Sequence, residues 1–448
     1  MLYKFIKPSA TSFPKLIPLF LIITIIIQYD ESTYPLALPV IQEKMHIDPT
    51  LSNWLITSYF LGTAAFSIPF SKFSQQFGIC RTSYVLLSLT GIFYFISYFI
   101  TNIYLLIILR FLVGCSSAGL HSIRNSMSAI YAKDRNFSIN ATLVLKSVLL
   151  AVCPTAGSLF IQYCGIGSIF LVPGSCCILS ILGMLCVEEW RVETHLKFDF
   201  LGSLVLSVVL VCVNLALTLA GNGLFTFAFL SLTASCALGA LLCCLEKRHP
   251  NPILRADFLK PVRFTLVLNV VNYYLQNSLS FVFPQMLKAL GYSTTQVGLL
   301  QSCAAAGGIA ATALSAVLLQ RLSLGVLLVV SYLLFVLTVI GGMLTRESPI
   351  FALIMTSFFA LGLASTTYGQ ILVQAPPDLL PAISGLPTST RMVGSALAYS
   401  LSSIGWTLGR EIIVFVFVTA LACVALGLSA HIFRINQSKQ IQNFELSI

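Results

Sequence analysis

Five charged residues lie inside long apolar segments of this 448-residue chain. A charged side chain near the middle of a lipid bilayer costs several kcal/mol unless it is paired with an opposite charge or hydrated. Residues in such positions commonly bind protons, ions or substrates, so these five are the first candidates for function. They are Asp30, Glu31, Arg110, Lys146 and Arg391.

Asp30 and Arg110 are expected at the same depth in the membrane. Asp30 lies about 14 residues into its apolar segment from the cytoplasmic side, and Arg110 lies about 7 residues into its own segment from the opposite side. At about 1.5 Å of rise per residue, both lie roughly 20 Å from the cytoplasmic face. This predicts either a permanent ion pair that fixes helix packing or a proton-coupling site. Glu31 is turned by about 100° from Asp30 on a helix, so the sequence leaves its part in proton coupling open.

Lys146 and Arg391 are expected to share a second depth in the membrane. Each lies about nine residues from the cytoplasmic end of its segment, and the two segments belong to opposite halves of the chain. Two uncompensated cations at one depth could bind an anionic group of a substrate. Alternatively, each long side chain extends to the cytoplasmic interface, and for Arg391 a role in helix packing is favoured.

The apolar segment at residues 264–287 carries amide and hydroxyl groups in place of charge. Asn269, Asn272 and Gln276 recur at helical spacing on one face. Tyr273 lies beside them in the sequence. Such side chains predict the lining of a polar cavity, and hydrogen bonds between helices are the alternative.

The composition excludes several classes of protein. Of all residues 57% are hydrophobic and only 9% are charged, whereas soluble domains carry about 25% charged residues. A soluble enzyme, a nucleic-acid-binding protein and a disordered chain are excluded by this shortfall. The mean hydropathy is +0.92, so the bilayer is expected as the solvent. The 13 cysteines are scattered through apolar segments without a CxxC pair or a suitably spaced His, so neither a metal site nor a disulfide is predicted.

Fourteen segments are long and apolar enough to span a membrane, which requires about 20 residues each. The predicted fold class is therefore an all-α polytopic membrane protein. The spans are residues 16–39, 52–71, 82–101, 103–124, 137–161, 167–187, 200–220, 223–244, 264–287, 296–319, 323–344, 349–373, 382–407 and 411–433.

The distribution of Lys and Arg predicts the orientation, because cytoplasmic loops carry an excess of both. With a cytoplasmic N-terminus, eighteen of them lie in cytoplasmic segments, Lys72 and Arg124 among them, and four lie on the opposite side. Both termini are therefore predicted to be cytoplasmic, in the plasma (inner) membrane. Near Arg124, His121 either extends the polar face of its helix or, as is favoured, meets cytoplasmic water.

The charge pattern also predicts how the chain is divided. The connector EKRHPNPILRADFLKPVR at residues 246–263 is the longest charged loop and marks a boundary between two halves. Residues 200–244 contain no charge, so the two helices there are expected to face lipid or other apolar helices. The expected organisation is a six-helix bundle at 1–195, two inserted helices at 196–245, the connector, and a second six-helix bundle with a short cytoplasmic tail at 264–448.

Eight short motifs, in order along residues 25–410, resemble one known family. They are DESTYPLALP (30–39), SNWLITSYFL with Trp54, RFLVGCSSAG (110–119), CPTAGS (153–158), IFLVPG (169–174), FDFLG (198–202), LGYSTTQVGLL (290–300) and TRMVGSALA around Arg391. Together they resemble the fourteen-helix drug–proton antiporter branch of the major facilitator superfamily. The resemblance implies that Asp30 is the acid of the first span and Arg110 the Arg of proton coupling. Pro154 and Gly157 are what remains of the gating motif in the fifth span.

The loop after the second span departs from the family pattern. It reads SKFSQQFGICR at residues 71–81, where the family pattern has an Asp and a further basic residue. Gly78 and Arg81 match the pattern, but Gln75 and Gln76 stand in the two charged positions. The ionic latch that the resemblance implies is thus reduced to neutral hydrogen bonding.

The resemblance implies two six-helix bundles around a central cavity, with a substrate site near the midplane that opens alternately to each side. The predicted function is proton-coupled antiport that exports small amphipathic or cationic compounds, as in multidrug efflux and antibiotic resistance. The proton gradient is the expected energy source, because no GxxxxGK[ST] phosphate-binding loop is present and no cofactor is implied. A monomer is expected to suffice. Proton coupling is assigned to Asp30, Arg110 and Glu31, and substrate binding to Lys146, Asn269, Asn272, Tyr273, Gln276 and Arg391.

Two alternatives stay open at this point. An anionic metabolite or a siderophore-like chelator would suit Lys146, Arg391 and the amides of residues 264–287. A membrane sensor or assembly protein built on a transporter fold, with no transport of its own, is a function of another class. An enzyme is not expected, since no His cluster, acid pair or nucleophile–base spacing lies within the spans.

Overall fold

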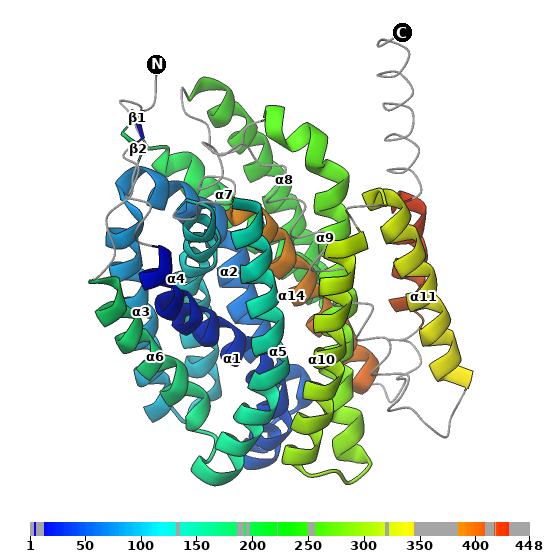
Figure 1. The fold of residues 1–448 in the computed structure, drawn as a ribbon. Coiled ribbons are helices and arrows are strands. Elements are labelled where there is room, and N and C mark those ends of the chain that lie inside the picture. Colours follow the sequence, from blue (N-terminus) through cyan, green and yellow to red (C-terminus); the bar gives the residue numbers. More distant parts are fainter. Residues whose placement is uncertain are drawn as a thin grey trace.

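The structure is a computed structural model. It describes residues 4–5, 13–130, 135–185, 192–193, 198–221, 223–249, 256–318, 322–344, 384–407, 416 and 418–429. Helices make up almost all of this part of the chain, which confirms the predicted all-α class (Figure 1). Beside them, the two-residue strand β1 (Lys4–Phe5) pairs antiparallel with β2 (Val192–Glu193), so the start of the chain lies against the segment that follows the sixth helix.

Six helices cover the first part of the chain, and each contains or overlaps one predicted span. They generally extend beyond the predicted ends, because a helix continues past the apolar stretch until a turn residue ends it. The six are α1 (Phe13–Met45), α2 (Pro49–Phe77), α3 (Ile79–Phe99), α4 (Ile103–Ile130), α5 (Arg135–Cys164) and α6 (Ser168–Met184).

Six labelled helices follow in the rest of the described chain. They are α7 (Phe200–Gly221), α8 (Phe225–Arg248), α9 (Ala256–Ala289), α10 (Thr294–Leu318), α11 (Leu324–Leu344) and α14 (Gly385–Thr407). Each again corresponds to a predicted span. The span expected at 349–373 lies outside the described residues, and within the one expected at 411–433 an apolar helix covers Val418–Ser429.

Five helices of the described chain are long and apolar enough, by length and composition, to cross a membrane. They are Ile79–Phe99, Ile103–Met127, Val144–Cys164, Phe200–Ala220 and Phe225–Arg248. Helices such as α1, α2, α9 and α14 are as long and carry many polar side chains. Their polar side chains are turned into the protein: Thr57 and Thr63 of α2 and Thr388 of α14 are fully buried. A membrane helix can carry polar groups where it faces other helices or a cavity, so these helices are expected to surround the centre of the bundle.

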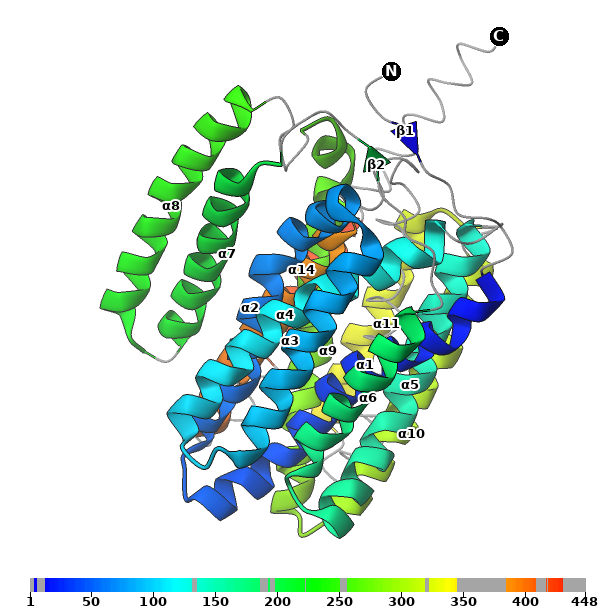
Figure 2. The same ribbon diagram turned by 90° about the vertical axis from the view of Figure 1, so that its left-hand side faces the viewer.

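Helices α7 and α8 stand at one side of the bundle (Figure 2). The α7 helix packs on α2, where the Ser207 hydroxyl donates to the carbonyl of Ala65 at 3.1 Å. The outer helix α8 exposes Phe225, Phe227 and Phe229 at 71%, 61% and 66%. These apolar side chains at the edge of the bundle suit contact with lipid tails, as the absence of charge in residues 200–244 predicts.

At one end of the bundle, α2 and α4 are joined to α14 by hydroxyl groups. The Ser384 hydroxyl lies 2.9 Å from that of Ser71 and 3.0 Å from that of Ser126. The amide of Gly385 donates to the Ser71 hydroxyl at 3.1 Å. The backbones of Gly385 and Ser67 are so close that any Cβ at 385 would overlap the Ser67 carbonyl. This seam therefore depends on the smallest side chains.

A second seam joins α5 to α10 at the end that carries the α5–α6 and α9–α10 turns. The Thr155 hydroxyl lies 2.7 Å from that of Ser302, and the Thr155 amide donates to the same oxygen at 3.1 Å. A Cβ at Gly298 would overlap the Ser158 side chain and would lie 2.9 Å from the carbonyl of Pro154. The two seams bring early and late helices together at opposite ends of the bundle.

We expect Gly385→Val to open the α2–α14 seam while the helices stay folded, because the added side chain cannot fit against the α2 backbone. In a Ser71→Cys/Ser384→Cys background, oxidation should cross-link the pair, whose hydroxyls lie 2.9 Å apart in the structure. The yield should fall about fivefold or more when Gly385→Val shifts the population to the open arrangement. Gly239→Val in α8 is the matched control, since nothing lies within 4 Å of a Cβ there. An unchanged yield would show that this seam tolerates the side chain.

Candidate functional site

Asp30 on α1 and Arg110 on α4 form a buried ion pair. The two guanidinium nitrogens donate to the two carboxylate oxygens at 2.8 and 3.0 Å, and both side chains are 1% exposed. Two parallel charge-assisted bonds of this kind fix both distance and orientation. The estimate that these residues lie at one depth is thereby confirmed, and the pair joins two helices of the first six.

The surroundings of Arg110 provide further contacts for its charge. Its Nε donates to the carbonyl of Leu55 at 3.1 Å. The guanidinium carbon lies 3.9 Å from the ring centroid of Tyr34 and 4.7 Å from that of Tyr59. Aromatic faces attract a cation most strongly where water is excluded. Arg110 is thus held from several sides and not by Asp30 alone.

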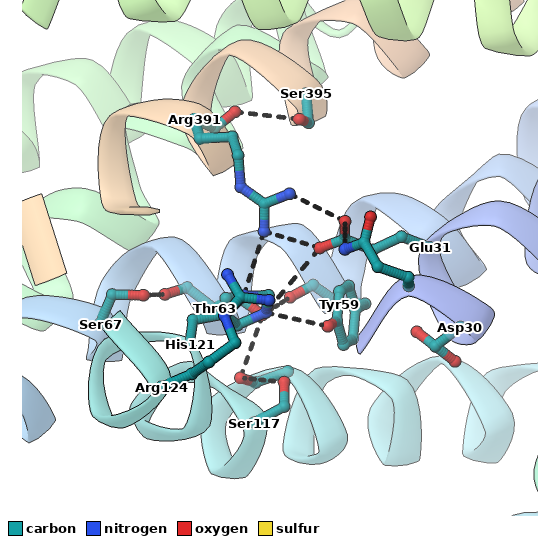
Figure 3. A network of polar contacts seen from close by, with 12 residues as sticks. Asp30, Glu31, Tyr59, Thr63, Ser67, Ser117, His121, Arg124, Arg391 and Ser395 are labelled. Atoms are coloured by element: carbon teal, nitrogen blue, oxygen red, sulfur yellow. Dashed lines mark hydrogen bonds and ion pairs between the residues drawn. The ribbon is translucent and has the colours of Figure 1, made fainter. Parts of the chain in front are cut away.

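Glu31 faces another partner on a distant part of the chain. Both of its oxygens accept from Arg391 of α14, at 2.7 and 2.8 Å. The amide of Gln28 donates to it at 3.4 Å, and Nε2 of His121 lies 3.8 Å away. Figure 3 shows this group, with the Asp30 carboxylate turned away from Glu31. The two neighbouring acids therefore belong to separate ion pairs, as their angular offset on a helix allows.

His121 lies within this network, so the favoured expectation that it meets cytoplasmic water is wrong. It is fully buried. Its Nδ1 lies 3.2 Å from Nη2 of Arg391, and its Nε2 lies 3.4 Å from the Tyr59 hydroxyl. His121 lies three helical turns from Arg110 along α4. This spacing in the sequence indicates a polar face that continues along the helix. Sequence reasoning did not find Tyr59 or Gln28 as members of the group.

Arg124 and Lys72 are buried inside the bundle, although the count of cytoplasmic cations places them in loops. Arg124 lies in α4 and Lys72 in α2, and they are only 3% and 5% exposed. Arg124 appears beside His121 in Figure 3. Without these two, sixteen Lys and Arg residues remain on the predicted cytoplasmic side against four on the opposite side. The predicted orientation is therefore unchanged.

Lys146 on α5 and Arg391 meet at Tyr273 of α9. The Lys146 ammonium donates to the Tyr273 hydroxyl at 3.0 Å and lies 5.2 Å from the ring centroid. The Arg391 guanidinium carbon lies 5.5 Å from the same centroid. Both side chains are buried inside the bundle, and the expected common level of the two cations agrees with this arrangement. Arg391 is paired with Glu31, so the expectation of two uncompensated cations is wrong for Arg391.

Some amide side chains of α9 lie between helices, and others line a cavity. Asn269 donates to the Pro387 carbonyl at 3.0 Å and to the Thr390 hydroxyl at 2.9 Å, and Asn272 accepts from the Tyr332 hydroxyl of α11. Both Asn side chains are fully buried between helices, which is the alternative that the sequence left open and not the predicted cavity lining. Gln276 does line a cavity.

This cavity lies between α1, α2, α5, α9, α10 and α14, and its volume is about 70 Å³. Such a volume holds a few water molecules, so the surrounding helices have to move apart to admit a small organic solute. Its charged lining in the described chain consists of Glu31, Lys146 and Arg391. Apolar and aromatic groups such as Phe60 and Phe283 complete the wall, together with the amides Gln28, Gln276, Asn277 and Gln301. Asp30 and Arg110 are not among its described lining residues.

The residues assigned to gating have structural explanations. Gly78 joins α2 to α3 at φ 113°, a conformation that L side chains rarely adopt. Arg81 is exposed in the first turn of α3. Pro154 lines the cavity from α5. Gly157 allows α5 to approach α1, because a Cβ there would overlap the Thr33 side chain.

A bundle of long helices around a central cavity with a charged lining is typical of a polytopic membrane transporter. The chain belongs to the Major Facilitator Superfamily, whose family model matches residues 20–409. The match includes both ion pairs and the whole described lining of the cavity. The superfamily that the motifs resemble is thus confirmed.

One curated relative and several solved structures agree with this assignment. The riboflavin transporter RibZ of Clostridioides difficile (strain 630) is 24% identical over 364 residues, which are 78% of this chain and 78% of that protein.

The human organic anion transporter MFSD10 (TETRAN) superposes with a TM-score of 0.65 at 12% identity, over 94% of this chain and 100% of that one. A POT family transporter in complex with 5-aminolevulinic acid gives 0.66 at 14% identity, over 94% and 96%. A D-xylose–proton symporter gives 0.63 at 11% identity, over 93% and 96%. At these identities the likeness shows the fold.

Proposed function

We propose that the protein is a proton-coupled secondary transporter that exports a small organic solute by alternating access, as in the drug–proton antiporter branch that its motifs resemble. The observation that carries the proposal is the carboxylate of Asp30, which is buried against Arg110 beside the cavity but outside its described lining. An acid in this position can exchange a proton without being a ligand of the solute. The solute and the proton then use separate sites that share helix α1.

The contacts of Arg110 suggest how protonation moves the helices. A protonated Asp30 loses the charge that holds the bidentate pair. Arg110 still has the Leu55 carbonyl and the rings of Tyr34 and Tyr59, so its charge is not left without partners. Helix α1 can then shift against α4 at a smaller cost. Because Glu31 is the next residue of α1, the same shift changes the wall of the cavity.

The lining of the cavity favours a flat, polar solute. Phe60, Phe283 and Tyr273 offer apolar and aromatic surface, and the amides Gln276 and Gln301 offer hydrogen bonds. A flavin-like heterocycle has this chemistry, which accords with the name of the relative RibZ. A lipophilic cation is the weaker candidate, since two cations and one carboxylate are the described charges of the lining.

With the orientation that the basic residues predict, both termini face the cytoplasm. The α2–α14 seam then closes the cytoplasmic end of the cavity, and the α5–α10 seam closes the opposite end. In this proposal each seam opens in turn, and no cofactor is required beyond the proton gradient.

The proposal is tested by Asp30→Asn, which keeps the shape of the side chain and removes its proton exchange. In proteoliposomes with a pH-sensitive dye inside, riboflavin added to the wild type should drive a proton flux, and the variant should show less than about a tenth of it. Asp48→Asn, at an exposed position after α1, is the matched control. An unchanged proton flux in Asp30→Asn would remove Asp30 from the coupling mechanism. Riboflavin uptake that ignores an imposed pH gradient in the wild type would argue against coupled transport altogether.

A further inference from the structure

The Glu31–Arg391 pair crosses the cavity and joins helices far apart in the sequence. Glu31 is on α1 and Arg391 on α14, 360 residues apart. Both residues line the cavity. The Glu31 side chain is 10% exposed and that of Arg391 5%, whereas both members of the Asp30–Arg110 pair are 1% exposed. A solute in the cavity can therefore reach the Glu31–Arg391 pair directly.

A second cation lies beside this pair. Lys146 and Arg391 both lie against Tyr273, at 5.2 and 5.5 Å from its ring centroid. Lys146 belongs to α5 and Arg391 to α14, so the two cations come from early and late helices. Bringing two cations together in a place of low water content is costly unless an anion neutralises them. In the structure Glu31 is the cavity-lining carboxylate that does so.

We propose that Lys146 and Arg391 form the binding site for an anionic group of the transported solute, and that Glu31 is the internal counter-ion which this group displaces. The inference rests on the proposed function, because it takes the central cavity as the transport site. The anionic group is a carboxylate, phosphate or sulfonate, which share the charge and the acceptor oxygens that Arg and Lys recognise.

Displacement is feasible because Glu31 has other partners. Gln28 donates to it at 3.4 Å, and His121 lies 3.8 Å away, on the side of α4. When the solute takes Arg391, the carboxylate can keep Gln28 and His121 as polar neighbours. These polar neighbours lower the cost of separating the buried carboxylate from Arg391.

The exchange also changes the link between the two groups of helices. In the structure Glu31 of α1 holds Arg391 of α14. With the solute bound, its anionic group would hold Lys146 of α5 and Arg391 of α14. Binding therefore replaces one connection across the cavity by another. A solute without the anionic group would leave the Glu31–Arg391 pair in place.

The test compares riboflavin with riboflavin 5′-phosphate, which share one body and differ by the anionic group. Their dissociation constants are measured by flavin fluorescence with purified protein in detergent, and the ratio of the two isolates the phosphate. The wild type should bind the phosphate ester about tenfold more tightly than riboflavin. Glu31→Gln should bind the ester about tenfold more tightly than the wild type does, with its affinity for riboflavin unchanged. Lys146→Met should bring the ratio close to one, and Lys146→Arg should largely restore it. Glu43→Gln and Lys44→Met, which are exposed on the same α1 helix, are the controls.

Three results would overturn the inference. These are a wild-type ratio near one, a Glu31→Gln protein that binds the ester no better than the wild type, and a protein that binds no ester at millimolar concentration. Melting temperatures of the variants separate a lost site from a lost fold. The experiment measures binding in detergent without a gradient, so its outcome does not depend on proton coupling. Failure here would thus leave the proton-coupling result of Asp30→Asn intact, and failure of coupling would leave the ratio intact.

Discussion

Arg110→Met is expected to reduce the stability of the protein more than any other single substitution considered for this site. It leaves the Asp30 carboxylate, 1% exposed, without the two bonds at 2.8 and 3.0 Å that now neutralise it. Removing one partner of a buried ion pair costs about 3–5 kcal/mol. The Leu55 carbonyl also loses its donor at 3.1 Å. Since whole proteins are stable by only about 5–15 kcal/mol, we expect little folded protein at 37 °C.

The measurement is the melting temperature in detergent, together with the yield of monodisperse protein. Arg263→Met, at an exposed position on α9, is the matched control and should melt like the wild type. The double variant Asp30→Asn/Arg110→Met should recover most of the lost stability, because no buried charge is then left without a partner. A double variant that melts as low as Arg110→Met would mean that Arg110 stabilises the fold through Tyr34, Tyr59 and Leu55 instead.

The Asp30–Arg110 pair could be predicted from the sequence because it depends on simple geometry. Each residue occupies a nearly straight helix, and the rise per residue converts a position in the sequence into a depth. The two opposite charges at one depth, in an apolar medium, have few other partners. The helices themselves follow from the apolar segments, and the labelled ones all correspond to predicted spans. Their ends were harder to predict, since α1 and α9 continue well beyond their apolar stretches.

The partners of Glu31 and of the α9 amides could not be predicted in the same way. Depth places Glu31 near several groups, but the choice of Arg391 depends on how α14 lies against α1. Asn269 and Gln276 share one face of α9, yet Asn269 contacts α14 and Gln276 faces the cavity. Helices cross at an angle, so one face of a helix meets different neighbours along its length. Periodicity identifies the face and leaves the neighbours undetermined.

His121 shows the same limit, because a residue that the sequence places in contact with water is buried in the structure. Its position toward the predicted cytoplasmic end of a span is typical of a residue that meets water. In the structure α14 covers this part of α4, and Arg391 lies 3.2 Å from the ring. The Ser384 and Gly385 contacts with α2 and α4 hold α14 in this place. Only the packing of late helices on early ones makes the site buried.

Arg391→Glu has the second largest expected effect, and it acts on function more than on folding. It places a second carboxylate opposite Glu31, where bonds at 2.7 and 2.8 Å now exist. Like charges at this distance repel strongly in a site with little water. We expect α14 to move away from α1 and transport to fall at least about a hundredfold, a loss of roughly 3 kcal/mol in the closed arrangement. Riboflavin 5′-phosphate flux into proteoliposomes measures the loss.

The exchanged variant Glu31→Arg/Arg391→Glu separates the two functions of Arg391. It restores an ion pair between α1 and α14 and keeps the net charge of the cavity, so the melting temperature and the Ser71→Cys/Ser384→Cys cross-link should recover. Binding of the phosphate ester should recover only in part, because the guanidinium then comes from α1 and no longer faces Lys146 across Tyr273. Full recovery of both would show that any cation near Lys146 suffices. Recovery of neither would mean that Arg391 is required for its contacts with His121 and Tyr273, which an exchange of charge does not reproduce.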